Sequence, residues 1–131
     1  MLTLTRDAYD DIVYLGYGGG SEEVCGILAG EYGDEASYVA DVYPVENAAE
    51  TPQIRYAMEP EEQLAAIDEV EAVGLEVVGF YHSHPAGPTR PSETDADRAT
   101  WPDYSYAICA FDGYPFLGSW RWRGDDAGFE G

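Results

Sequence analysis

The most informative part of this chain is Val77-Val78-Gly79-Phe80-Tyr81-His82-Ser83-His84-Pro85, an apolar run that carries the only two histidines and ends at a proline. The run predicts a buried β-strand over 76–84. Side chains alternate between the faces of a strand, so His82 and His84 are expected to point the same way, alongside Val78 and Phe80. Both imidazoles should then project at the C-terminal end of the strand, where sites in such sheets tend to form.

Asp95 follows the second histidine by eleven residues and completes a candidate metal-binding set. Neutral imidazoles are the commonest side-chain metal ligands, and a carboxylate adds a third, hard ligand. The loop over 86–91 contains Gly87 and prolines and can fold the chain back, which would bring Asp95 towards His82 and His84. Three protein ligands leave a fourth tetrahedral position for water, and this is the arrangement of a catalytic zinc site.

A zinc site of this kind favours amide hydrolysis as the reaction. Zinc lowers the pKa of water and polarises a carbonyl group. A general base must also take the proton of the water and pass it to the leaving amine. The chain contains 26 acidic residues, so composition alone does not identify this base.

Structural roles for the same residues are the alternative. A pair of strand histidines can be packed polar groups, and Ser92-x-x-Asp95 fits a capping box with Ser92 as N-cap and Asp95 at N3. The two readings are compatible, because a cap can hold Asp95 in place while its other oxygen binds a metal. Taken together, the features favour the metal.

Apolar residues at helical spacing predict two helices. The first is expected from Thr5, as N-cap, to about Leu15, with Gly16–Gly20 ending it. The second is expected to start at Pro60 and to stop at Gly74. One face of the second helix is expected to consist of Leu64, Ile67, Val70 and Val73.

Strands are predicted over 24–31, 37–45, 54–58, 76–84, 104–111 and 116–123, with the turn Asp112-Gly113 between the last two. The mixed order of strands and helices predicts a single α/β or α+β domain. We expect this domain to occupy residues 1–124. The acidic, glycine-rich tail over 125–131 is expected to fray.

Cys25 and Cys109 lie in apolar runs, which favours buried free thiols over a disulfide. Neither cysteine belongs to a C-x-x-C motif, so a cysteine zinc site is not expected. The N-terminus has no charged segment followed by an apolar core, and no apolar run approaches a membrane-spanning length. These features predict a cytoplasmic protein.

The charge of the chain is strongly unbalanced, since 6 basic and 26 acidic residues give a formal net charge of −20. All the basic residues are arginines. Such a chain repels nucleic acid and anionic membranes, so neither is expected as a partner. We interpret the acidity as an adaptation to high salt, where screening removes the self-repulsion, and a halophilic source is the corresponding hypothesis. An acidic face that attracts a basic partner is the alternative.

A longer pattern surrounds the histidines. His82-Ser83-His84-Pro85 is followed by Ser92 and Asp95, eight and eleven residues after the second histidine, and is preceded by Glu23-Val24-Cys25-Gly26-Ile27-Leu28-Ala29-Gly30. On these residues the chain resembles the JAMM (MPN-plus) zinc metalloproteases, and among them the archaeal-type, deubiquitinase-like and desampylase-like isopeptidases. The family signature is a Glu, H-[ST]-H-P, and then a Ser and an Asp at those spacings. The resemblance spans roughly Glu23 to Phe111.

The resemblance implies a role for each matched residue. One zinc ion per chain would be bound by His82, His84 and Asp95. Glu23 would be the general acid/base, and Ser92 would help to stabilise the oxyanion of the tetrahedral intermediate. Glu22 directly precedes Glu23, but the spacing to Gly26 favours Glu23 for this role.

The resemblance also implies a fold and a substrate. The fold would be an α/β JAMM/MPN-like domain with a twisted, mixed and mostly antiparallel sheet flanked by helices. The partner would be a ubiquitin-like modifier protein or its conjugates, whose C-terminal tail pairs with strand edges in a groove with 47–58 as one wall. The reaction would remove the modifier from lysines. Open alternatives are trimming of a cysteine or peptide from a sulfur carrier, a non-catalytic MPN-type scaffold, and a homodimer as the assembly.

Overall fold

The computed structural model describes residues 2–52, 56–85, 95, 101–110, 116–124 and 128–130. In chain order its elements are β1 (Leu2–Leu4), α1 (Arg6–Gly18), β2 (Cys25–Glu31), β3 (Ser37–Val45), α2 (Pro60–Ala72), β4 (Glu76–His84), β5 (Ser105–Ala110), β6 (Phe116–Trp122) and β7 (Phe129–Glu130). The predicted strands over 37–45 and 76–84 have the observed bounds. Within the described ranges, neither helix is long and apolar enough to cross a membrane.

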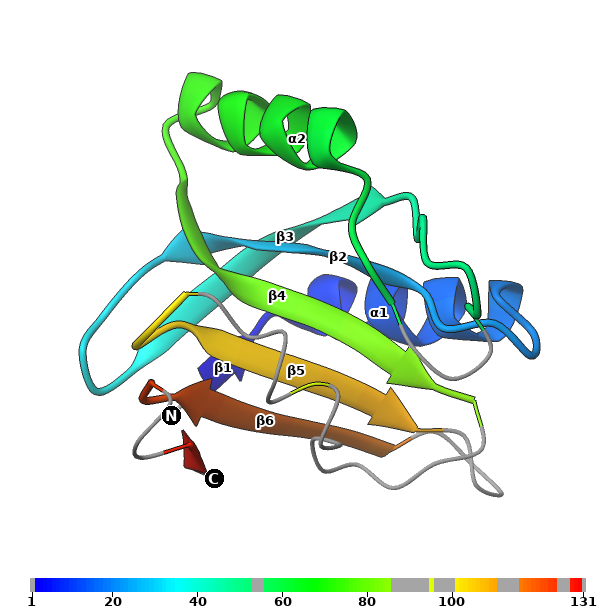
Figure 1. The fold of residues 1–131 in the computed structure, drawn as a ribbon. Coiled ribbons are helices and arrows are strands. Elements are labelled where there is room, and N and C mark those ends of the chain that lie inside the picture. The colour runs from blue at the N-terminus through cyan, green and yellow to red at the C-terminus, as the bar shows by residue number, and fades with distance from the viewer. Residues whose placement is uncertain are drawn as a thin grey trace.

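The described strands form one sheet of seven, in the order β1-β3-β2-β4-β5-β6-β7. Neighbouring strands are antiparallel except for the pairs β1–β3 and β4–β5, which are parallel. The helices α1 and α2 lie on opposite sides of this sheet (Figure 1). The prediction of a single α/β domain with a mixed, mostly antiparallel sheet between helices is confirmed.

Each helix covers its own apolar core. The core on the α1 side is built from Ala8, Ile12, Leu28, Val39, Val78, Tyr81, Ala107 and Cys109. The core on the α2 side is built from Ile27, Ala29, Val45, Ala66, Val70, Phe80, Tyr106 and Trp122. The central strands β2 and β4 contribute to both cores, which explains why they are apolar on both faces.

The predicted N-cap of the first helix is confirmed, because the Thr5 hydroxyl accepts a hydrogen bond from the backbone N–H of Ala8 at 3.1 Å. The helix continues three residues beyond Leu15 and ends at Gly18, within the predicted terminating segment Gly16–Gly20. Glycine inside a helix costs only about 1 kcal/mol relative to alanine. Gly16 is therefore tolerated inside the helix, where it is buried.

The predicted face of the second helix is half wrong. Val70 is buried and Ile67 is half-buried, but Leu64 and Val73 are exposed to 61% and 63%. Ala66, which the periodicity did not select, is buried instead. Residues turn by about 100° each along a helix, so Leu64 lies well off the line through Ala66 and Val70. Val73 is the C-cap residue, where the helix ends.

Three other expectations have mixed outcomes. The predicted strand over 54–58 falls partly outside the described residues, and Met58 forms only an isolated antiparallel bridge with Asn47. The turn Asp112-Gly113 also lies outside them. In the tail, the expected fraying does not apply to the described part, since β7 pairs with β6 and the Phe129 ring lies 5.5 Å from that of Tyr106.

A β-bulge in β4 changes which side chains share a face. Leu28 pairs with Gly79 and the next residue, Ala29, pairs with Val77, which leaves Val78 as an extra residue on β4. A bulge interrupts the alternation of faces. Val78 therefore lies in the α1-side core, opposite to Phe80, and its predicted place beside the histidines is wrong.

Candidate metal centre and active site

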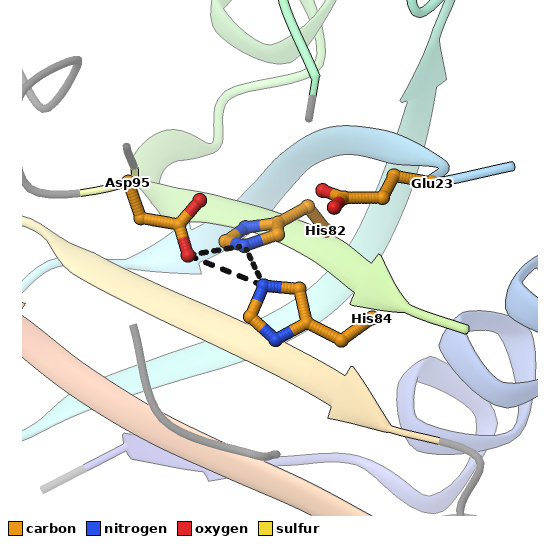
Figure 2. Close-up of side chains that lie close together, drawn as sticks. All are labelled: Glu23, His82, His84 and Asp95. Carbon is orange, nitrogen blue, oxygen red and sulfur yellow. Dashed lines mark hydrogen bonds and ion pairs between the residues drawn. The ribbon is translucent and has the colours of Figure 1, made fainter. Parts of the chain in front are cut away.

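Four ionisable side chains meet at the C-terminal end of β4, on the α2 side of the sheet. They are Glu23, His82, His84 and Asp95, and one possible ligand atom from each lies within 4.8 Å of the others. All four side chains are buried. Figure 2 shows the Asp95 carboxylate and the two imidazoles converging, with the Glu23 carboxylate reaching towards them from the segment just before β2. The structure thus brings together four of the five predicted site residues, while Ser92 lies outside the described ones.

The possible metal-ligand atoms of His82, His84 and Asp95 form a nearly regular triangle. His82 Nε2 and His84 Nε2 are 3.1 Å apart, and each lies 3.2 Å from Asp95 Oδ2. Ligands about 2.0–2.1 Å from a tetrahedral zinc ion are about 3.3 Å from one another, so the triangle has the size that zinc requires. Imidazole nitrogens and a carboxylate oxygen are also ligand types that zinc accepts.

Burial sets the protonation state of His82. It lowers the pKa of the imidazole, and the hydrogen bond and charge of Asp95 oppose this only in part. A neutral imidazole has a free lone pair for a metal, whereas a protonated one does not. The Tyr56 ring stacks on the His82 ring with centroids 4.3 Å apart and an angle of 25°, which restrains the orientation of the imidazole.

Glu23 has the environment of a general acid/base. Burial raises its pKa from 4.5 to about 7, while the charge of His84 lowers the pKa and that of Asp95 raises it. Its Oε1 is buried and has no hydrogen-bond partner among the described residues. A carboxylate whose pKa lies near neutrality can both accept and return a proton under ordinary conditions. Glu22 is exposed, whereas Glu23 belongs to the buried cluster.

Pairing between β2 and β4 places Glu23 beside the histidines. Cys25 pairs with His82. One step further, the backbone N–H of Val24 donates to the Ser83 hydroxyl at 2.9 Å, and the Ser83 N–H donates to the Val24 carbonyl at 3.0 Å. Ser83 therefore joins the histidine strand to the segment that carries Glu23. Sequence reasoning assigned no role to Ser83, although its position between the two histidines is a signal that could have drawn attention to it.

A cavity of about 380 Å³ lies next to the candidate metal centre on the same side of the sheet. Its lining is largely aromatic and consists of Tyr56, Ala57, Met58, Gln63, Phe80, Trp101 and Tyr106. It is joined to the centre through Tyr56, which stacks on His82. The predicted groove wall over 47–58 thus contributes three of the lining residues, at its C-terminal end.

The fold and this group of side chains define a class, the JAMM-type protease domains. The chain belongs to the family of prokaryotic homologs of the JAB domain, whose family model matches residues 5–123. It is 40% identical over 129 residues to a desampylase of Haloferax volcanii, covering 95% of this chain and 90% of the relative. It is also 36% identical over 87 residues to the CysO-cysteine peptidase of Mycobacterium tuberculosis, covering 66% of this chain and 58% of that one.

The fold is similar to that of a solved structure at moderate sequence identity. A protein from Desulfitobacterium hafniense, solved in solution, matches with a TM-score of 0.87 and 32% identity, covering 99% of this chain and 88% of the other. The predicted JAMM/MPN-like family is confirmed. The relatives named as peptidases also confirm that the chain is an enzyme of the protease class.

Proposed function

We propose that this protein is a zinc-dependent isopeptidase that releases a ubiquitin-like modifier from lysine side chains by hydrolysing the amide bond after its C-terminal tail. The observation that carries the proposal is the buried triangle of His82, His84 and Asp95 donor atoms, 3.1–3.2 Å apart, beside the Glu23 carboxylate. The similarity to a desampylase over nearly the whole chain supports the same substrate class.

The proposed roles follow from the chemistry of each group. His82, His84 and Asp95 would hold one zinc ion, which when bound polarises a carbonyl group and makes water more acidic. Glu23 would take the proton from the attacking water and deliver it to the leaving lysine amine. Ser92 is proposed, from the family signature, to donate a hydrogen bond to the oxyanion.

The aromatic cavity beside the centre is the proposed site for the modifier's tail. An extended tail can pair its backbone with the segment 47–58 and place an apolar side chain between Met58, Phe80 and Trp101. The described ends of this segment form an antiparallel bridge between Asn47 and Met58, which supports the proposal. The tail would then end at His82 and His84, where the scissile amide is needed.

The proposed setting is the cytoplasm of an organism that lives at high salt. The formal net charge of −20 supports the salt adaptation, because screening is required to offset repulsion among so many carboxylates. Both cysteines are free and buried, which is compatible with a reducing compartment. The proposed assembly is a homodimer, which a measurement of the mass in solution would test.

The decisive experiment offers the purified protein a ubiquitin-like modifier joined to a lysine side chain, in molar KCl. We expect cleavage after the modifier's C-terminus, loss of cleavage with a zinc chelator, and recovery with added zinc. Metal analysis should find about one zinc per chain in wild type and a clear loss in His84→Ala. Glu23→Gln should keep the zinc but lose cleavage. A Glu23→Gln protein with full activity would reject the assigned mechanism.

A second candidate function is the removal of a cysteine from the C-terminus of a sulfur-carrier protein. It is favoured by the similarity to the CysO-cysteine peptidase. Both reactions break an amide after a modifier-like tail, so the metal centre does not distinguish them. Offering both substrates to one preparation would, because the better substrate has the larger kcat/KM. Binding of a modifier without cleavage of either substrate would instead identify a non-catalytic scaffold.

A further inference from the structure

Glu23 lies outside any strand, in the connection between α1 and β2. Besides the bonds between Val24 and Ser83, its position relative to the histidines depends on hydrogen bonds to its own backbone. The Glu23 N–H donates to the Pro52 carbonyl at 2.6 Å, and the Glu23 carbonyl accepts from Asn47 Nδ2 at 2.8 Å. Both polar groups of the Glu23 backbone are thus bonded to one segment, 47–52.

The same Asn47 side chain also organises that segment. Its Oδ1 accepts hydrogen bonds from the backbone N–H groups of Ala49 and Ala57, each at 3.0 Å. Two N–H donors on one side and a carbonyl on the other define the amide orientation chemically, with oxygen towards the donors and nitrogen towards Glu23. Only a side chain with both a donor and an acceptor can make this pair of connections.

The residues bound by Asn47 Oδ1 connect to the candidate metal centre. Ala57 follows Tyr56, whose ring stacks on His82, and precedes Met58, which pairs with Asn47 and lines the aromatic cavity. A main-chain hydrogen bond from the Ala48 N–H to the Ala57 carbonyl at 2.8 Å closes the same small ladder. One amide group therefore joins the wall of the cavity to the backbone of Glu23.

We infer that Asn47 is a positioning residue for the reaction: its Nδ2 holds the Glu23 backbone in place while its Oδ1 holds the wall of the tail-binding cavity. The inference rests on the proposed function, in which Glu23 is the general base and the cavity receives the tail. A small displacement of a base from its reactive geometry has large effects on rate.

The variant Asn47→Asp separates the two ends of the side chain. Aspartate keeps an oxygen for Ala49 and Ala57 but replaces the donor to the Glu23 carbonyl with a second oxygen. We expect kcat to fall by about tenfold or more while KM changes by less than about threefold, because an interaction with the base and not with the tail is lost. Zinc affinity, measured by competition with a chelator, should stay at the wild-type value.

Asn47→Leu removes both ends without adding a charge. It should lower kcat as Asn47→Asp does. It should also raise KM, because the hydrogen bonds that hold Ala49 and Ala57 in the wall of the cavity are lost. Ser21→Asp is the matched control for charge, because Ser21 is exposed and lies two residues before Glu23. This control should leave kcat and KM at wild-type values. If Asn47→Asp does not fold, the fall in kcat of Asn47→Leu tests the same link.

Amide hydrogen exchange tests the inference without a substrate. The Glu23 N–H donates to the Pro52 carbonyl, so its exchange reports how firmly the Glu23 backbone is held against the segment 47–52. In Asn47→Asp the bond to the neighbouring Glu23 carbonyl is lost and this contact should loosen, so exchange of the Glu23 amide should accelerate at least about tenfold while those of Ala49 and Ala57 stay slow. In Asn47→Leu all three should accelerate. Unchanged exchange at Glu23, or wild-type kcat in both Asn47 variants, would overturn the inference. Absence of cleavage by the wild-type protein would reject the proposed function instead. The exchange measurement would still test whether Asn47 holds the Glu23 backbone, because it needs no substrate.

Discussion

At the scale of single residues, burial determines the chemistry of the site. His82 is 1% exposed and Glu23 is 5% exposed, so each is largely removed from water. Burial disfavours a charge on either group, and it therefore lowers the pKa of the imidazole and raises that of the carboxyl. A neutral imidazole can bind a metal, and a carboxyl group whose pKa is near 7 can transfer protons. Both properties come from the same cause.

Glu23 should destabilise the metal-free protein above neutral pH. Its folded pKa of about 7 exceeds the ordinary value of 4.5, so the folded state holds this proton more tightly than the unfolded state does. The stability that this group contributes is present below about pH 4.5 and is lost as the pH rises through about 7. In chelator-treated protein we expect Glu23→Gln to raise Tm by several degrees at pH 8 and by much less at pH 5. Equal shifts at both values would contradict this, as would a decrease at pH 8.

The two thiols should be unreactive in the folded protein. Burial raises the pKa of Cys25 to about 12 and that of Cys109 to about 11, and the Cys25 thiol donates to the Val45 carbonyl. Only the thiolate attacks an alkylating reagent. We expect no labelling by iodoacetamide at pH 8 within an hour in native protein, and labelling of both cysteines after denaturation, read by mass spectrometry. Rapid labelling of the native protein would show that one thiol is accessible.

At the scale of elements, the end of α1 determines how the chain enters the site. The helix ends at Gly18, and Gly19 caps it with its N–H pointing back to carbonyls of the last turn. The connection that follows leads directly to Glu23. The space around these two glycines differs sharply, which makes them a matched pair for testing the packing of this connection.

Gly18→Ala and Gly19→Ala should have opposite effects on stability. Nothing lies within 4 Å of a Cβ built on Gly18, and alanine is favoured over glycine in a helix, so Gly18→Ala should stabilise by about 0.5 kcal/mol. A Cβ on Gly19 would lie 2.5 Å from Val24 Cγ1 and 2.8 Å from the Glu22 carbonyl oxygen. Gly19→Ala should therefore destabilise by about 1–3 kcal/mol, as overpacking does. Urea unfolding measures both, and equal effects would reject the predicted close packing at Gly19.

At the scale of the whole molecule, the dominant feature is the excess of negative charge. The formal net charge is −20, and the described surface has few basic groups to balance it. Arg121 is largely buried, with its guanidinium bonded to the Ser37 hydroxyl and the Asp34 carbonyl. Arg123 is paired with Asp103 and Glu130. Neither arginine is therefore available to neutralise the rest of the surface.

Salt should stabilise the folded protein by screening. The Debye length falls from about 10 Å at 0.1 M to about 3 Å at 1 M, which removes most repulsion between surface carboxylates. We expect Tm to rise by at least about 10 °C between 0.1 M and 2 M KCl, corresponding to a few kcal/mol for a chain of this size. Sucrose at matched osmolality is the non-ionic control and should have a smaller effect. An unchanged Tm in KCl would reject the salt adaptation.

Local patterns were sufficient to predict much of this fold. Thr5 and Pro60 mark helix starts through capping and through a fixed backbone angle, and the apolar runs over 37–45 and 76–84 give strands with the observed bounds. The spacing of His82 and His84 on one strand puts them on one face, as observed. These features depend on interactions between residues that are near one another in the chain, so they can be read without knowing the partner strands.

Contacts between distant segments required the tertiary structure. The bulge at Val78 exists only because β4 pairs with β2 in a shifted register, and the exposure of Leu64 depends on how α2 meets the sheet. The hydrogen bond from Asn47 to Glu23 joins residues that are 24 positions apart, and no local sequence pattern predicts it. The sequence alone determined the residue types of the candidate centre and their spacing. Only folding decided their distances, their burial and their pKa values, because these depend on long-range packing and on the exclusion of water.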